Sequence, residues 1–71
     1  MLNNLIEFRK NAGYTQADMG AVIGTTRQNY CNIERGKIKG TADTWLAIQK
    51  KFNLSVEQIE KLREVSTDER A

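Results

Sequence analysis

Residues 15–36 constrain the fold of this chain more than any other stretch of it. They read as two short helices, over about residues 16–23 and 27–34, joined by a tight turn at Gly24. Glycine adopts the left-handed backbone conformation that such a turn requires without steric cost. Gly20 supplies a small residue on the first helix, where the second helix should pack closest. The segment therefore predicts two helices that meet at a sharp corner.

Capping residues mark where these two helices begin and end. Thr15, with Asp18 three residues later, has the pattern of a capping box in which Asp replaces the usual Glu. Thr26 is a favourable N-cap for the second helix, and Gly36 ends it. This is the layout of a helix-turn-helix motif, whose second helix enters the major groove of DNA.

Apolar residues at helical spacing predict three further helices, over about residues 2–11, 42–51 and 56–65. No segment alternates with period two for long enough to form a strand. We therefore expect an all-α fold, a compact five-helix domain that contains the helix-turn-helix. The domain should span residues 1–65, and residues 66–71 should form a frayed polar tail.

Composition narrows the chemistry that this chain can support. Its 71 residues make one small domain, with one cysteine and no histidine, so we expect neither an intrachain disulfide nor a metal site. No apolar run approaches the roughly 20 residues of a membrane span, and the N-terminus does not read as a signal peptide. We expect a cytoplasmic protein with no membrane partner, no cofactor and no small-molecule ligand. Paired carboxylates, or a nucleophile beside a base, are not visible, so we expect no enzymatic activity.

Charge is distributed unevenly along the chain although the net charge is only +2. Residues 25–39 carry an excess of three positive charges, and residues 55–71 carry an excess of two negative charges. A basic middle fits a polyanion, but an ordinary solvated surface would account for so small a bias equally well.

The outward side of the second helix of the motif is polar and poor in acidic residues. Its members are Arg27, Gln28, Asn29 and Asn32. Arginine reads guanine, and asparagine or glutamine reads adenine, through paired hydrogen bonds to base edges. A plain helical bundle would explain the inward apolar residues Ile23, Tyr30 and Ile33, but it would not explain this polar side. The pattern favours DNA recognition.

Four stretches of the sequence together carry a family resemblance: FRKNAGYTQ at 8–16, IGTT at 23–26, NIERGK at 32–37 and FNLS at 52–55. In combination they resemble the Cro/phage-repressor type of helix-turn-helix, the XRE-like family. The resemblance covers about residues 2–62. It implies a lambda-repressor-like DNA-binding domain of five helices and a role in transcription regulation.

The resemblance also implies roles for individual residues. Gln16 occupies the position at which the family contacts a DNA phosphate, although it could be an ordinary first residue of a helix. Four residues hold positions that the family uses against base edges and adjoining phosphates, and they are Thr26, Arg27, Gln28 and Asn32. Asn29 could join them. Lys37 and Lys39 lie where a loop approaches the backbone, or they are merely solvated charges. Arg9 and Glu34 should form a structural ion pair.

Two residues of the motif raise specific expectations about packing. Tyr30 replaces the small aliphatic residue that the family uses, so its hydroxyl should reach the rim of the core or a hydrogen-bonding partner. Cys31 should point away from the core edge as an incidental small residue. A redox-sensing role for Cys31 has no second cysteine to support it.

Dimerisation follows from the small reach of one recognition helix, which reads only a few base pairs. The apolar residues of the last helix exceed what a short terminal helix needs for docking. Leu62 and Val65 are therefore the candidate dimer contacts, joined by residues from the loop before that helix. The alternative is that both only close the core of one chain.

The sequence thus predicts a sequence-specific regulator of transcription, Cro-like or a short repressor, that binds a palindromic double-stranded operator as a homodimer. An alternative function from another class is an antitoxin, or another protein-binding module of the same fold. Such a module would use the acidic residues of the C-terminal segment to engage a basic protein. These residues are Glu57, Glu60, Glu64, Asp68 and Glu69.

Overall fold

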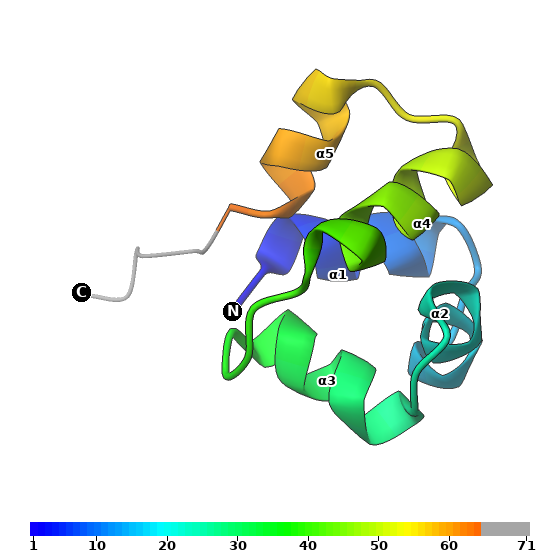
Figure 1. The fold of residues 1–71 in the computed structure, drawn as a ribbon, viewed down its shortest axis with the longest axis vertical. Coiled ribbons are helices and arrows are strands. Elements are labelled where there is room, and N and C mark those ends of the chain that lie inside the picture. Colours follow the sequence, from blue (N-terminus) through cyan, green and yellow to red (C-terminus); the bar gives the residue numbers. More distant parts are fainter. Residues whose placement is uncertain (65–71) are drawn as a thin grey trace.

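Five α-helices make up the regular structure of residues 1–64, the part of the chain that this computed structural model describes. In chain order they are α1 Asn3–Asn11, α2 Gln16–Ile23, α3 Arg27–Arg35, α4 Ala42–Phe52 and α5 Val56–Leu62 (Figure 1). No strand occurs within residues 1–64. The expected all-α, five-helix fold is confirmed. The last helix ends earlier than predicted, and residues 65–71, with Val65 and the predicted polar tail, lie outside the described part.

Side-chain caps begin four of the five helices, and those at Thr15 and Thr26 confirm the sequence-based prediction. Thr15 and Ser55 each form a complete capping box, with Asp18 and Gln58 respectively. Thr26 accepts a hydrogen bond from the backbone N–H of Asn29 at 3.1 Å, and Thr41 begins α4 in the same way. These bonds satisfy backbone donors that a helix leaves open at its first turn.

Left-handed residues end three of these four helices, whereas α5 ends at Arg63 in the ordinary right-handed conformation. Gly24 closes α2 with φ 76° and Gly36 closes α3 with φ 79°. Asn53 closes α4 with φ 55° and is the one non-glycine residue with positive φ in the described part. Asparagine tolerates this conformation better than most residues, which explains its use here.

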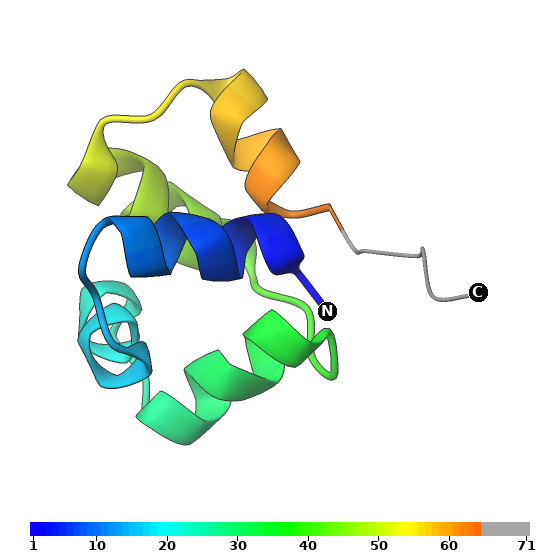
Figure 2. The same ribbon diagram turned by 180° about the vertical axis from the view of Figure 1, so that it is seen from behind.

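α1 lies between α5 and α3, and α2 packs against both α3 and α4 (Figures 1 and 2). Apolar side chains from all five helices or their flanks meet in one core: Leu2, Leu5, Met19, Tyr30, Ile33, Trp45, Ile48, Ile59 and Leu62. Phe8 and Phe52 meet edge to face at one side of this core, with ring centroids 4.9 Å apart. The arrangement leaves one side of α3 free of packing partners.

Gly20 sets the distance between α2 and the turn that leads into α3. A Cβ atom at this position would lie 3.1 Å from the carbonyl oxygens of Thr25 and Thr26. That separation is closer than ordinary van der Waals contact between these atom types. The short separation fits the expectation of a small residue in α2 where the corner closes.

Tyr30 corrects the sequence-based expectation. Its side chain is fully buried, and its hydroxyl reaches neither the rim nor any hydrogen-bonding partner among the described residues. Burial, and the nearby Glu34 carboxylate, raise the pKa of the Tyr30 hydroxyl far above its ordinary value.

Within residues 1–64, no helix has both the length and the apolar character that crossing a bilayer requires.

Candidate nucleic-acid interface

The N-terminal half of α3 presents a polar surface to solvent. Thr26, Arg27, Gln28 and Asn29 are exposed, and Asn32 is half-buried. The inward side of the helix carries Tyr30, Ile33 and Glu34, which are all buried. Apolar packing thus anchors one side of α3 and leaves its amides and arginine on the other. The five residues predicted to contact DNA here thus lie at the N-cap of α3 and along its first six residues.

Hydrogen bonds already orient three amides of this surface. Gln28 Nε2 lies 3.4 Å from Asn32 Oδ1, one helical turn away, in a weak hydrogen bond. Asn29 Nδ2 donates to Thr25 Oγ1 at 2.9 Å and so ties α3 to the turn before it. This bond leaves the side-chain oxygen of Asn29 available to accept a hydrogen bond from a ligand. Gln28 and Asn32 together offer both donors and acceptors.

Sequence reasoning missed Arg35 as a member of this surface. Arg35 is exposed and follows Gln28 by seven residues and Asn32 by three, a spacing that places the three on one side of an α-helix. Helical periodicity counted from Gln28 was the signal that could have found it. Arg35 adds a positive charge at the C-terminal end of the polar surface.

Two lysines extend the positive charge beyond α3. Lys37 and Lys39 are both exposed in the loop between α3 and α4. The backbone N–H of Lys37 donates to the carbonyl of Asn32 at 2.9 Å, so the loop begins in a defined position against α3. Flexible side chains on a fixed loop suit contacts with a phosphate backbone, which need charge rather than detailed shape.

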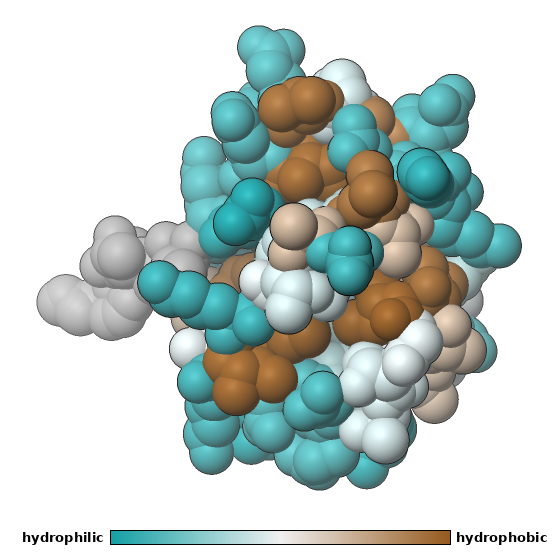
Figure 3. Space-filling view, viewed as in Figure 1, coloured by the Kyte–Doolittle hydropathy of each residue, from teal (hydrophilic) through white to brown (hydrophobic). Residues whose placement is uncertain are grey.

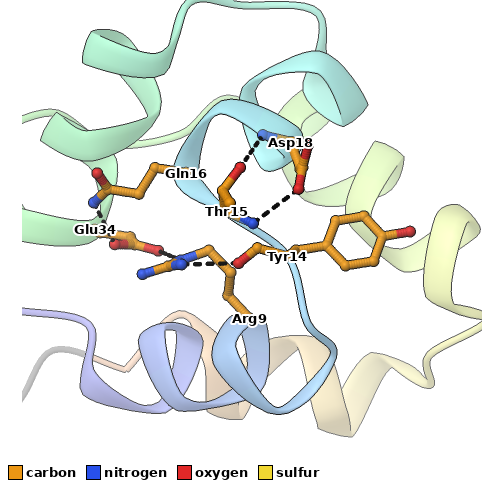
Figure 4. Close-up of polar contacts among 6 residues, drawn as sticks. All are labelled: Arg9, Tyr14, Thr15, Gln16, Asp18 and Glu34. Carbon is orange, nitrogen blue, oxygen red and sulfur yellow. Dashed lines mark hydrogen bonds and ion pairs between the residues drawn. The ribbon is translucent and has the colours of Figure 1, made fainter.

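The residue at the start of α2 is connected to the buried ion pair. Arg9 Nε lies 2.6 Å from Glu34 Oε2, and Arg9 Nη1 donates to the carbonyl of Tyr14 at 2.9 Å. Gln16 Nε2 donates to the other carboxylate oxygen, Glu34 Oε1, at 3.0 Å (Figure 4). The predicted pair is present, and it joins α1, α2 and α3 in one polar network.

Asp18 supports the same end of α2. Its carboxylate accepts a hydrogen bond from the backbone N–H of Thr15 at 3.0 Å, and this bond is the main cause that lowers the pKa of Asp18. The charged carboxylate also interacts favourably with the positive end of the helix dipole. Figure 4 shows the capping box beside Gln16 and the ion pair.

Leu62, one of the two predicted dimer contacts, is buried within the single chain. Its side chain is 7% exposed and belongs to the core of the single chain. A side chain that is already buried offers little area to a second molecule, so the prediction of a contact at Leu62 gains no support. Val65 lies outside the described residues.

Exposed apolar side chains occur elsewhere on the molecule. Figure 3 shows hydrophobic areas over α5, over α4 and near the loop after α3, separated by hydrophilic side chains. Among the large apolar residues of the described part, leaving Met1 aside, the exposed fraction is largest for Val56 at the start of α5, at 65%, and next for Leu46 on α4, at 46%. Among residues 1–64, Val56 is therefore the most accessible large apolar side chain close to the predicted dimer region.

Cys31 also departs from its expected position. It is 9% exposed and counts among the buried residues of α3, although it stands outside the central cluster of apolar side chains. The helix carries it toward neighbouring residues rather than toward solvent. A buried thiol is poorly placed to react with an external oxidant.

Comparison with known proteins agrees with this geometry. A family model described as Helix-turn-helix matches residues 5–59, most of the chain. The sequence is 34% identical over 64 residues to the uncharacterized HTH-type transcriptional regulator YgzD of Bacillus subtilis (strain 168), an alignment that covers 90% of this chain and 97% of the relative. No solved structure matches the chain. The chain belongs to the XRE-like, Cro/C1-type helix-turn-helix family of DNA-binding transcriptional regulators.

Proposed function

We propose that this protein is a sequence-specific repressor-type regulator, Cro-like or a short repressor, that inserts α3 into the major groove of a double-stranded operator. One observation carries the proposal. The only side of α3 left without packing partners in the described structure is the one that bears Arg27, Gln28 and Asn32. Such a protein acts in the cytoplasm, and nothing in its chemistry calls for a cofactor or a small-molecule ligand.

The proposed contacts divide into two kinds. Arg27, Gln28 and Asn32 read base edges, with Asn29 at the margin of the groove. Five further residues contact the phosphate backbone and fix the position of α3 along the DNA without reading its sequence. These backbone contacts are Gln16, Thr26, Arg35, Lys37 and Lys39.

Binding-site selection from a random duplex library tests this proposal. The purified protein should enrich one sequence, and Gln28→Ala should weaken binding to that sequence by roughly 1–3 kcal/mol and relax the base preference at one position. Lys50→Ala serves as the matched control, because Lys50 is exposed on α4 and belongs to no proposed contact. A failure to enrich any sequence would remove sequence-specific binding from consideration.

We further propose that two copies bind a palindromic operator together, because a single helix reads too few base pairs to select one site in a genome. The burial of Leu62 moves the proposed contact to the start of α5. There Val56 is exposed and follows the loop that ends α4. A small contact of this kind gives a weak dimer in free solution and a stronger one on DNA.

Mobility-shift titrations on full and half operators test the dimer. Val56→Lys should abolish cooperative occupancy of the full operator and leave affinity for the half operator unchanged. Leu46→Lys is the control, since Leu46 is also an exposed apolar residue but lies on α4. Cooperative binding that survives Val56→Lys would place the contact elsewhere.

The antitoxin alternative receives less support. Glu57, Glu60 and Glu64 are exposed, but Lys61 and Arg63 are exposed among them, so residues 55–64 carry a net charge of only −1. The remaining acidic residues of that proposal, Asp68 and Glu69, lie outside the described part.

A further inference from the structure

Glu34 is an almost fully buried carboxylate, 2% exposed, with both of its oxygens in use. Oε2 accepts from Arg9 Nε at 2.6 Å, and Oε1 accepts from Gln16 Nε2 at 3.0 Å. The three side chains come from three different helices and converge as Figure 4 shows. The buried ion pair therefore reaches the half-buried first residue of α2, beside the proposed DNA-binding surface.

A carboxylate without a proton accepts hydrogen bonds and cannot donate them. Gln16 must therefore turn its amide nitrogen, and not its oxygen, toward Glu34. The second N–H of that nitrogen makes no hydrogen bond within the described residues. An amide that rotated freely would present its oxygen as often as its nitrogen, and an amide oxygen is repelled by a phosphate. Glu34 thus sets which end of the Gln16 amide is presented.

We propose that Glu34 is a positioning residue for DNA binding, which holds the Gln16 carboxamide so that its second N–H donates to a DNA phosphate. This inference rests on the proposed function. The guanidinium of Arg9 balances the charge of Glu34, which keeps the carboxylate from repelling the phosphate. Because the amide is ordered before DNA arrives, forming the contact costs little side-chain entropy.

A double-mutant cycle on the selected operator tests the coupling at one fixed salt concentration. Gln16→Ala should weaken wild-type binding about tenfold, in the range of a hydrogen bond to a charged group. In the Glu34→Gln background the same change should cost less than about threefold, because the amide is no longer held. Equal costs in the two backgrounds would overturn the proposal.

Asp18→Asn provides the matched control for this cycle. Asp18 is also a carboxylate near the start of α2, but it accepts from the backbone of Thr15 and makes no bond to Gln16. In the Asp18→Asn background, Gln16→Ala should still weaken binding about tenfold. If Gln16→Ala weakened binding much less in this background too, any disturbance of the start of α2 would have the same effect. That result would contradict a specific role for Glu34.

A second measurement uses the unmodified protein, in case Glu34→Gln does not fold. Nuclear magnetic resonance relaxation of side-chain NH₂ groups should find the Gln16 amide ordered in the free protein, and the exposed Asn3 amide mobile. Equal mobility of the two amides would overturn the proposal. This result does not depend on DNA. A failure of the wild-type protein to bind any duplex would instead overturn the proposed function. The two failures are distinguishable, because the order of the Gln16 amide is measured in the free protein.

Discussion

Tyr30 and Glu34 lie one turn apart on α3 and are both buried. They differ in whether their polar atoms have hydrogen-bonding partners. Glu34 has a donor at each carboxylate oxygen. The Tyr30 hydroxyl has no partner among the described residues, although it lies within reach of the charges of Arg9 and Glu34. An unmade hydrogen bond in the interior costs free energy that the packing of the tyrosine ring must offset.

Tyr30→Phe should therefore stabilise the protein, by about 1 kcal/mol, because it removes the unpartnered hydroxyl and keeps the ring. Urea unfolding at neutral pH, followed by the fluorescence of Trp45, measures the change. Tyr14→Phe is the control, since Tyr14 is only half-buried. A loss of stability in the Tyr30 variant would mean that the hydroxyl makes a hydrogen bond after all.

The advantage of Tyr30→Phe should widen in alkaline solution. Tyr30 has a pKa in the folded protein that is raised above its ordinary value of 10.0, chiefly by burial. A raised folded-state pKa gives stability that is fully present below the ordinary value and is lost as pH rises above it. The free energy of unfolding of the wild type and of Tyr30→Phe should be measured at about pH 7 and about pH 11. An equal difference between the two proteins at both pH values would contradict this prediction.

Asp18 produces the opposite pH dependence. Its hydrogen bonds to Thr15 lower the pKa of Asp18 in the folded protein below the ordinary value of 3.8. The resulting stability is present above that value and is lost as pH falls through the folded-state pKa. Between about pH 5 and pH 2, the wild type should lose more stability than Asp18→Asn. Parallel acid-unfolding curves of the two proteins would argue against the capping box as the source.

At the scale of the elements, α3 combines a buried side that fixes its position with the exposed side that we propose reads DNA. The caps at Thr26 and Gly36 define its length, and the bond from Lys37 N to the Asn32 carbonyl carries this order into the loop. The loop lysines should therefore act as a unit with the helix, but through charge alone.

Lys37→Ala and Lys39→Ala should weaken binding to all duplex sequences about equally. Each variant should lower the slope of log affinity against log salt concentration by about one unit, because one condensed counterion fewer is released. Titrations of the selected operator and of an unrelated duplex across a salt series measure this slope. Lys50→Ala should leave it unchanged, and an unchanged slope in a loop variant would remove that lysine from the interface.

At the scale of the whole molecule, α5 closes the core over α1. Leu62 and Ile59 are both buried in the common cluster, and the side chain of Asn4 donates to the carbonyl of Lys61 at 3.0 Å. In a domain of 71 residues each such contact is a large part of a small total stability. The folded single chain therefore needs the docking of α5 for its own stability, whether or not α5 also contributes to a dimer contact.

Leu62→Ala should destabilise the monomer by about 2–4 kcal/mol, the usual cost of removing a buried leucine side chain. Thermal unfolding followed by circular dichroism at low protein concentration measures the effect. Val56→Ala, at an exposed position of the same helix, should change stability by less than about 0.5 kcal/mol. A Leu62 variant as stable as the wild type would return Leu62 to the list of candidate dimer contacts.

The sequence by itself determined the helices of this protein and the corner between α2 and α3. Each N-cap side chain accepts a hydrogen bond from the backbone N–H three residues later, as at Thr15, Thr26 and Ser55. Left-handed backbone conformations, which few residue types tolerate, end helices at Gly24 and Asn53. Such signals are local, so they are readable without a fold. The identity of the exposed side chains of α3 follows from helical periodicity for the same reason.

Only the tertiary structure decided how distant residues meet. Gln16 and Glu34 are 18 positions apart in the sequence, and no local pattern shows that one holds the amide of the other. The full burial of Tyr30 and the place of Leu62 in the core also depend on how α1, α4 and α5 pack together. Periodicity tells which side of a helix is apolar, but the depth of burial and the partner of each polar atom depend on the helices that cover it.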